Sequence, residues 1–216
     1  MKIPKDPLLF FEELADVYDR WYDENPLVYE SELAALRAAL PKGQGIEIGV
    51  GSGRFAATLG IATGIDPSPK MVEMAKKRGI NAVLGYGEHL PFKEGEFDFA
   101  LLVGVLCFVK EPFLVVQEAA RVVKNGGLVI MGEVPSDSKW GRIYKGATER
   151  NPFLEVMTLH SPETVIQWME RAGLRLKQTL QTLYQGPFEF LAAEIPRPGH
   201  DQGSFVVYVG EAGGRK

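Results

Sequence analysis

A glycine-rich stretch with a carboxylate before it is the first place where this sequence could do chemistry. Glu47 precedes Gly49, Gly51 and Gly53, and glycines at this spacing allow a tight turn and a close approach of backbone to a ligand. A dinucleotide fingerprint of the G-x-G-x-x-G type requires Gly or Ala at position 54, where this chain has Arg54. A carboxylate two residues before the first glycine would lie close to a doubly negative pyrophosphate, so Glu47 favours a cationic ligand.

Two later segments add carboxylates to the candidate site. Asp66 ends the next apolar run, 19 residues after Glu47, a separation at which a strand-terminal carboxylate can accept both hydroxyl groups of a ribose. Gly87 and Glu88 follow in a further loop, where a flat base would lie. Dinucleotide sites share this spacing, so a nucleotide-dependent oxidoreductase stays open as an alternative.

The elements that must position these residues alternate between apolar strands and helices. We predict strands over 44–49, 61–66, 82–84, 97–103 and 128–134, and helices over 54–59, 70–78 and 112–124. Near-continuous apolar strands separated by helices are typical of a parallel sheet covered on both faces. In such a sheet, ligands bind beyond the carboxyl ends of the strands, which is where the glycines and carboxylates lie.

Flanking segments complete the expected architecture. Apolar spacing predicts two helices before the first strand, over 11–22 and 29–40, and a helix over 161–171 after the parallel strands. Residues 174–184 and 204–209 alternate like antiparallel strands around a Pro-rich excursion at 186–203. We therefore expect an antiparallel pair at the end of the parallel sheet.

Composition narrows the class of protein. The 216 residues include 24 basic and 28 acidic side chains, a net charge of −4 that disfavours nucleic-acid and anionic-membrane partners. The lone Cys107 excludes an intrachain disulfide and a thiolate zinc cage, and no His, Cys, Asp or Glu cluster has metal-ligand spacing, so we expect no metal. The apolar run at 8–11 is too short for a signal peptide and no window approaches a membrane span, so we expect a cytoplasmic protein.

Taken together, the ordered motifs resemble a known enzyme family. They are Glu47-x-Gly-x-Gly-x-Gly, Asp66-Pro67-Ser68 with Met71, Gly87-Glu88-x-Leu90-Pro91-Phe92, Phe97-Asp98 and Gly126-Gly127. Over roughly residues 44–134 the sequence is similar to class I S-adenosylmethionine-dependent methyltransferases, specifically the small-molecule branch with the type 11 domain. The resemblance implies an α/β, Rossmann-like three-layer sandwich with a seven-stranded, mostly parallel sheet of order 3-2-1-4-5-7-6, in which strand 7 is antiparallel.

The same resemblance implies how the chain is organised. It predicts a single methyltransferase domain over 1–216, with an N-terminal helical cap at 1–41 and a cofactor-binding core at 42–134. Residues 135–216 would form a variable acceptor region and the C-terminal antiparallel strands. The oligomeric state is left open.

The resemblance also assigns residues to the cofactor, S-adenosylmethionine, whose product is S-adenosylhomocysteine. The glycine loop with Glu47 would hold the methionine part and Asp66 the ribose. The remaining candidates would surround the adenine and the other side of the cofactor: Pro67, Met71, Gly87, Glu88, Val103 and Gly104. The cofactor carries a net charge of +1, so a pocket lined by Glu47, Asp66 and Glu88 favours it over a phosphorylated nucleotide.

The acceptor side is less defined by the sequence. In the family an N-terminal helix closes over the sulfonium, which makes Tyr18 the catalytic candidate, while Tyr22, Trp140, Tyr144 and His160 are substrate-binding candidates. Methyl transfer to a small molecule by direct in-line displacement relies on positioning, which supplies roughly 7–11 kcal/mol of barrier reduction. Many relatives carry two histidines where this chain has Leu106-Cys107-Phe108, so a non-catalytic S-adenosylmethionine-binding protein is a further alternative, and the acceptor class stays open.

Overall fold

A computed structural model describes residues 6–146, 152–187 and 189–213 of the chain. Its helices are α1 (Pro7–Glu24), α2 (Pro26–Ala39), α3 (Arg54–Leu59), α4 (Pro69–Lys77), α5 (Pro112–Val122), α6 (Lys139–Gly146), α7 (Pro152–Glu155) and α8 (Pro162–Arg171). Its strands are β1 (Gly45–Ile48), β2 (Thr63–Asp66), β3 (Asn81–Leu84), β4 (Phe97–Val103), β5 (Val123–Glu133), β6 (Leu174–Thr182), β7 (Arg197–Pro198) and β8 (Phe205–Ala212).

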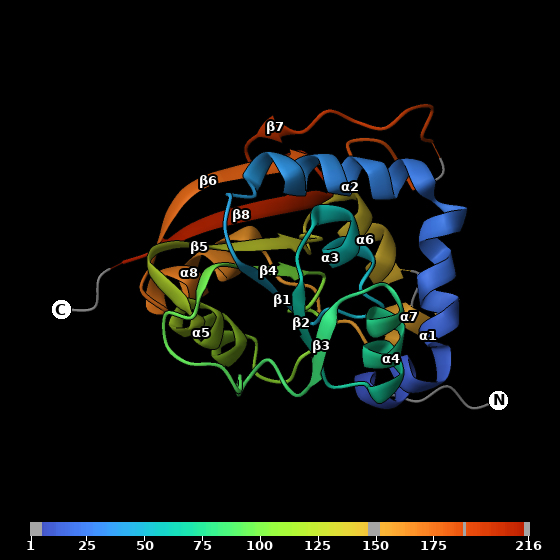
Figure 1. Ribbon diagram of the computed structural model, residues 1–216. Helices are drawn as coiled ribbons and strands as arrows, with labels where there is room; N and C mark the ends of the chain where they lie inside the picture. The colour runs from blue at the N-terminus through green and yellow to red at the C-terminus, as the bar shows by residue number, and fades with distance from the viewer. Residues whose placement is uncertain (1–5, 147–151, 188, 214–216) are drawn as a thin grey trace.

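The strands form one sheet in the order β3-β2-β1-β4-β5-β8-β6-β7 (Figure 1). Neighbours from β3 to β5 are parallel, whereas β8 runs antiparallel to both β5 and β6. The predicted strand order is confirmed, and so is the antiparallel direction of the last long strand of the chain, β8. The sheet has one strand more than predicted, because the Pro-rich segment returns along β6 as the two-residue β7. Pro198 has no N–H to donate and is therefore accommodated at this sheet edge.

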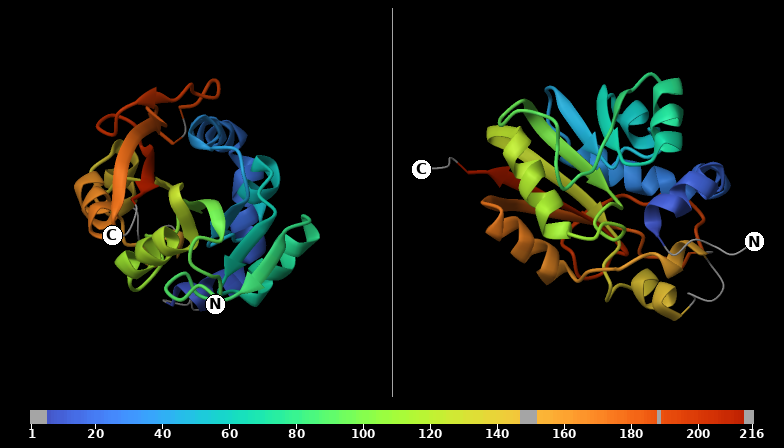
Figure 2. Two further views of the ribbon diagram at one scale, coloured as in Figure 1. Left: turned by 60° about the vertical axis from the view of Figure 1, so that its left-hand side comes forward. Right: turned by 90° about the horizontal axis from the view of Figure 1, so that it is seen from below.

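Helices cover both faces of the sheet and make three layers (Figure 2). One apolar cluster joins Ile46 and Ile48 of β1 to Val115 of α5 and Met169 of α8. A second cluster on the opposite face contains buried side chains of α2, α3 and α4. Successive apolar residues of the strands point to opposite faces, so both sides are buried, as the near-continuous apolar runs predicted.

Local sequence sets the ends of the helices next to the site. Ser68 caps α4 by accepting a hydrogen bond from the Met71 N–H, and Pro69 occupies the first helical position, as predicted. Helix α1 begins four residues earlier than predicted, because the Asp6 carboxylate accepts from Leu8 N–H and so caps the helix. Leu14 has non-helical backbone angles, which kink α1.

The connection between α5 and β5 also differs from the prediction. We expected the helix to continue to residue 124 and the strand to start at residue 128. Instead α5 ends at Val122 and β5 begins at Val123, with a shift in register between the pairs Phe97–Val123 and Phe99–Leu128. Gly126, with φ of 79°, lies in this irregular part of the strand, so the glycines bend the strand rather than stop the helix.

Candidate functional site

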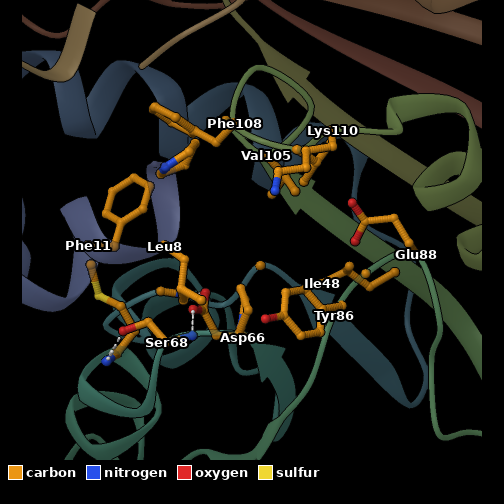
Figure 3. A pocket seen from close by; sticks show the side chains of 18 of the residues that line it. Leu8, Phe11, Ile48, Asp66, Ser68, Tyr86, Glu88, Val105, Phe108 and Lys110 are labelled. Atoms are coloured by element: carbon orange, nitrogen blue, oxygen red, sulfur yellow. Dashed lines mark hydrogen bonds between the residues drawn. The ribbon is translucent and has the colours of Figure 1, made fainter. Parts of the chain in front are cut away.

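A cavity of about 250 Å³ lies at the carboxyl ends of β1, β2 and β4, under helix α1 (Figure 3). Leu8 and Phe11 of α1 lie across it from Tyr86 and Glu88 of the loop after β3. The predicted site residues that line it are Tyr18, Gly49, Gly51, Asp66, Pro67, Met71, Gly87, Glu88, Val103 and Gly104. The fold therefore brings together residues from five separate segments of the sequence at one edge of the sheet.

Asp66 connects the end of β2 to the glycine loop. Its Oδ2 accepts a hydrogen bond from Gly51 N–H at 2.9 Å, and its Oδ1 accepts from Ser68 N–H at 3.0 Å. Burial raises the pKa of this carboxyl group to about 6, although the two N–H donors partly offset the effect. Each oxygen keeps further lone-pair capacity, so the carboxylate can still accept hydroxyl donors from a ligand in the cavity.

Two glycines of the lining leave space inside the cavity. Gly51 and Gly104 have φ of 51° and 61°, and a Cβ added at either would meet no protein atom within 4 Å. Because both residues line the cavity, added side chains would occupy space that a ligand needs. Gly53 differs: its Cβ would lie 2.9 Å from the Ala75 backbone, so this glycine allows close packing of the loop on α4 and does not line the cavity.

Glu47 does not line the cavity, contrary to the expectation that it would do so together with Asp66 and Glu88. Strand β1 directs Ile46 and Ile48 to one face of the sheet, so Glu47 points to the other, where it accepts a hydrogen bond from Ala56 N–H in the first turn of α3. Burial raises its pKa well above its ordinary value, and its Oε2 has no hydrogen-bond partner among the described residues. The cavity's acidic lining consists instead of Asp6, Asp66 and Glu88.

Helix α1 is fixed over the glycine loop by Asp19. The Asp19 carboxylate accepts from Ser52 Oγ at 2.5 Å, from Arg54 Nη2 at 3.1 Å and from Arg78 Nη2 at 2.7 Å. Burial alone would raise the pKa of Asp19, but these donors lower it to about 2. Arg54 also pairs with Asp23 at 2.8 Å, so the residue that breaks the dinucleotide fingerprint attaches α1 to the loop.

A second carboxylate joins the first half of α1 to α4. Glu12 Oε1 accepts hydrogen bonds from Ser68 Oγ and from Lys70 N–H, at the start of α4. Phe11 packs edge-to-face on Phe108, with ring centroids 4.9 Å apart, and closes the roof of the cavity. These α1 contacts were not predicted from the sequence, in which the apolar run at 8–11 is the one indication that this part of the chain packs against the site.

The third loop supplies the remaining wall. Gly87 packs closely on the core, since its Cβ would lie 3.1 Å from side-chain atoms of both Ile48 and Val115. Tyr86 lines the cavity and is 55% exposed, and Glu88 projects toward the cavity from the same loop (Figure 3). Lys110 is a basic lining residue on the opposite side.

The four substrate candidates do not line this cavity. Tyr22 donates to or accepts from the Tyr18 hydroxyl at an oxygen–oxygen distance of 3.1 Å, and therefore lies one side chain behind the wall. Trp140 is 2% exposed and its Nε1 donates to Gln185 O, so it packs in the core. His160 lines a second cavity with Cys107, and its Nε2 lies 3.2 Å from Leu106 O.

Tyr144, the fourth candidate, packs against Trp140 at a centroid distance of 5.9 Å and is partly buried. Cys107 is buried, and burial raises the pKa of its thiol well above the ordinary value, which is typical of an unreactive cysteine. Within the described ranges, no group of three or more His, Cys, Asp or Glu side chains is placed to hold a metal ion. None of the described helices is long and apolar enough to cross a membrane.

Comparison with known proteins identifies the family. Residues 46–131 match the Methyltransf_11 methyltransferase domain. A solved structure from Thermotoga maritima, named as a SAM-dependent methyltransferase and possible histamine N-methyltransferase, is 40% identical with a TM-score of 0.91, covering 94% of this chain and 98% of that chain. The chain therefore belongs to the class I S-adenosylmethionine-dependent methyltransferases, in the branch defined by this domain.

Two sequence relatives carry names without an activity. An uncharacterised protein of Methanocaldococcus jannaschii is 38% identical over 201 residues, which are 93% of this chain and 98% of that protein. An uncharacterised protein of Mycobacterium tuberculosis is 33% identical over 182 residues, 80% of this chain. The match spans 62% of the length of the mycobacterial relative.

Proposed function

We propose that this protein transfers a methyl group from S-adenosylmethionine to a small-molecule acceptor, with the cofactor in the cavity under α1. The observation that carries the proposal is Asp66, a buried carboxylate that lines the cavity at the end of β2 and is oriented by Gly51 and Ser68 N–H groups. A carboxylate held in this way accepts two vicinal hydroxyl groups, the pattern that a ribose presents.

The remaining lining residues fit the other parts of the cofactor. Gly51 leaves room for the amino-acid end next to β1, and Gly104 leaves room on the side of β4, while Gly49 lines the same part of the cavity and allows Val105 to pack closely. Pro67 and Met71 would cover one face of the adenine, while Gly87 and Glu88 would lie along its polar edge. When bound, S-adenosylmethionine supplies a methyl group on a positively charged sulfur.

Charge supports a cationic nucleoside over a polyphosphate. Asp66, Glu88 and Asp6 line the cavity against the single basic side chain of Lys110 among its described lining residues. A pyrophosphate would have to approach the Asp66 carboxylate without a compensating basic group at the glycine loop, because Arg54 is already paired with Asp19 and Asp23.

The acceptor is proposed to be a small molecule that reaches the cavity on the side of Tyr18. The roof of α1 excludes water and holds the reacting groups together, which is the main catalytic contribution that in-line displacement needs. The Thermotoga maritima relative is named as a possible histamine N-methyltransferase, which favours an amine among the acceptor classes.

Isothermal titration calorimetry with S-adenosylhomocysteine, NAD and ADP tests the proposal. We expect S-adenosylhomocysteine to bind at least about 100-fold more tightly than either phosphorylated nucleotide, which corresponds to about 2.7 kcal/mol. Equal or tighter binding of NAD or ADP would contradict the assignment and support the oxidoreductase alternative.

A further inference from the structure

One buried carboxylate on α2 has no role in the site described so far. Glu32 is 7% exposed, and no described residue donates a hydrogen bond to its carboxyl group. Burial alone raises its pKa to about 8. An isolated buried carboxylate destabilises a fold when it ionises, so its presence requires an explanation.

Helix α2 carries Glu32 toward the edge of the sheet where the cavity lies. The helix runs toward the amino-terminal edge of the sheet, since the chain enters β1 soon after Ala39. Leu36 lies beside the end of β5, because a Cβ added at Gly132 would be 3.3 Å from its Cδ2. Glu32 lies one turn earlier in α2, and therefore beyond the carboxyl end of β5.

Three tyrosines from two other helices lie near enough to Glu32 for its charge to act on their hydroxyl groups. Burial raises the pKa values of Tyr18, Tyr22 and Tyr144, and the nearby charge of Glu32 raises each of them further. Tyr18 and Tyr22 come from α1, which contacts α2, and Tyr144 comes from α6. The group Glu32, Tyr18, Tyr22 and Tyr144 is here called the acceptor cluster. Of its members Tyr18 lines the cofactor cavity and Tyr22 contacts the Tyr18 hydroxyl, so the cluster reaches the cavity through Tyr18.

Among the described residues, no cationic side chain is paired with Glu32. Arg54 lies 5.7 Å from the centre of the Tyr22 ring, but its guanidinium is paired with Asp19 and Asp23, and it does not affect the pKa of Glu32. The other ionisable groups that act on these tyrosines are Cys107, Glu47 and Asp66, none of which is cationic. A carboxylate among phenol rings is a typical environment for an ammonium group.

A carboxylate with a structural role has a different environment in this protein. Glu133, at the end of β5, is also buried, but its Oε1 accepts from Val105 N–H at 3.1 Å and Leu106 N–H at 3.0 Å. It thereby fixes the turn after β4. Glu32 makes no such contact with described residues, so the fold gives it no comparable function.

We infer that Glu32 is the catalytic carboxylate that binds a cationic amine acceptor beside Tyr18 and takes one proton from it. The inference rests on the proposed function. Proton transfer from R–NH₃⁺ to the Glu32 carboxylate leaves a neutral amine whose lone pair forms the new N–C bond. The S–C bond breaks with its electron pair remaining on sulfur, the methylated amine leaves as a cation, and the Glu32 proton passes to solvent.

An NMR titration tests the position of Glu32 without knowledge of the acceptor. The Glu32 side-chain carboxyl carbon is followed in ¹³C-glutamate-labelled protein and assigned with Glu32→Gln. Replacing S-adenosylhomocysteine by S-adenosylmethionine adds one positive charge, which should lower the Glu32 pKa by about one pH unit. Glu30, exposed on the same helix, should not shift and is the internal control. An unchanged Glu32 pKa would overturn the inference.

A panel of amines tests the acceptor class. The primary amines 2-phenylethylamine and histamine are compared with three molecules that lack an amine: the alcohol 2-phenylethanol, the phenol 4-ethylphenol and the carboxylate phenylacetate. We expect N-methylated products by mass spectrometry, at least 100-fold slower formation with Glu32→Gln, and wild-type rates with Glu30→Gln. Glu32→Gln should bind S-adenosylhomocysteine as the wild type does, which shows that it folds.

The outcomes separate the inference from the function on which it rests. Failure of S-adenosylhomocysteine to bind the wild-type protein would overturn the proposed function itself. Binding of the cofactor with no methylated amine, with methylation only of a phenol or carboxylate, or with full amine methylation by Glu32→Gln would overturn only the role of Glu32.

Discussion

Asp66 and Glu32 are buried carboxylates at the same edge of the sheet, and they differ in what surrounds them. Their exposed fractions are 8% and 7%, yet Asp66 accepts hydrogen bonds from two backbone N–H groups and Glu32 from no described residue. Burial raises the pKa of Asp66 to about 6 and that of Glu32 to about 8. In the proposed function, the cofactor side is thus oriented in advance by the fold, whereas the cationic acceptor would complete the side of Glu32.

The largest effect is expected when the oriented carboxylate is neutralised. Asp66→Asn loses one hydrogen bond to the glycine loop and the charge that strengthens those to a ribose, each worth about 1.5–3 kcal/mol. S-Adenosylhomocysteine affinity measured by calorimetry should fall at least about 100-fold. Glu73→Gln, on the exposed surface of α4, is the matched control. If Asp66→Asn bound S-adenosylhomocysteine as tightly as the wild type does, the contrast between Asp66 and Glu32 would have no basis.

The second prediction concerns the stability of the unpartnered carboxylate. The folded-state pKa of Glu32, about 8, lies above its ordinary 4.5, so ionisation weakens the wild-type fold as pH rises between these values. Glu32→Gln should therefore increase the free energy of unfolding by up to about 3 kcal/mol at pH 7, and by little near pH 4.5. Urea unfolding at both pH values measures this, and a destabilised Glu32→Gln would indicate an unseen structural partner.

A smaller loss of stability is expected when α1 is detached from the glycine loop. Asp19→Asn removes the charge that Arg54 and Arg78 share, at a cost of about 2 kcal/mol in urea unfolding. It should also speed S-adenosylhomocysteine dissociation, because helix α1 would move away from the cavity more often. Asp16→Asn is the control, since Asp16 is 67% exposed and pairs only loosely with Lys70 at 3.4 Å. Equal effects of the two variants would show that Asp19 does not hold the roof.

The smallest effect distinguishes the two carboxylates by pH. Because the Asp66 pKa is about 6, lowering the pH from 7 to 5 protonates this group and removes its capacity to accept two hydroxyl donors. Affinity for S-adenosylhomocysteine should decrease roughly tenfold. The decrease should be absent in Asp66→Asn and retained in Glu32→Gln; a pH dependence that follows Glu32 instead would reverse the assignment.

The same contrast explains what could be predicted from the sequence. The residues around Asp66 followed from glycines and carboxylates at fixed distances from strand ends, where local sequence and position in the sheet are coupled. The strand order followed from the resemblance to the methyltransferase family. Glu47 was misplaced because alternation along β1 turns it away from the cavity. The acceptor cluster was not predicted, since its members come from three separate helices, α1, α2 and α6, and Glu32 follows no short motif. Tyr18, Tyr22 and Tyr144 were named individually, without the carboxylate that unites them.

A crystal structure of the complex with S-adenosylhomocysteine tests the central claim most directly. The account predicts that both ribose hydroxyls contact Asp66, that the amino-acid end lies along Gly49 and Gly51, and that the sulfur faces Tyr18 and the acceptor cluster. A ribose bound away from Asp66, or a sulfur directed away from Tyr18, would contradict the account.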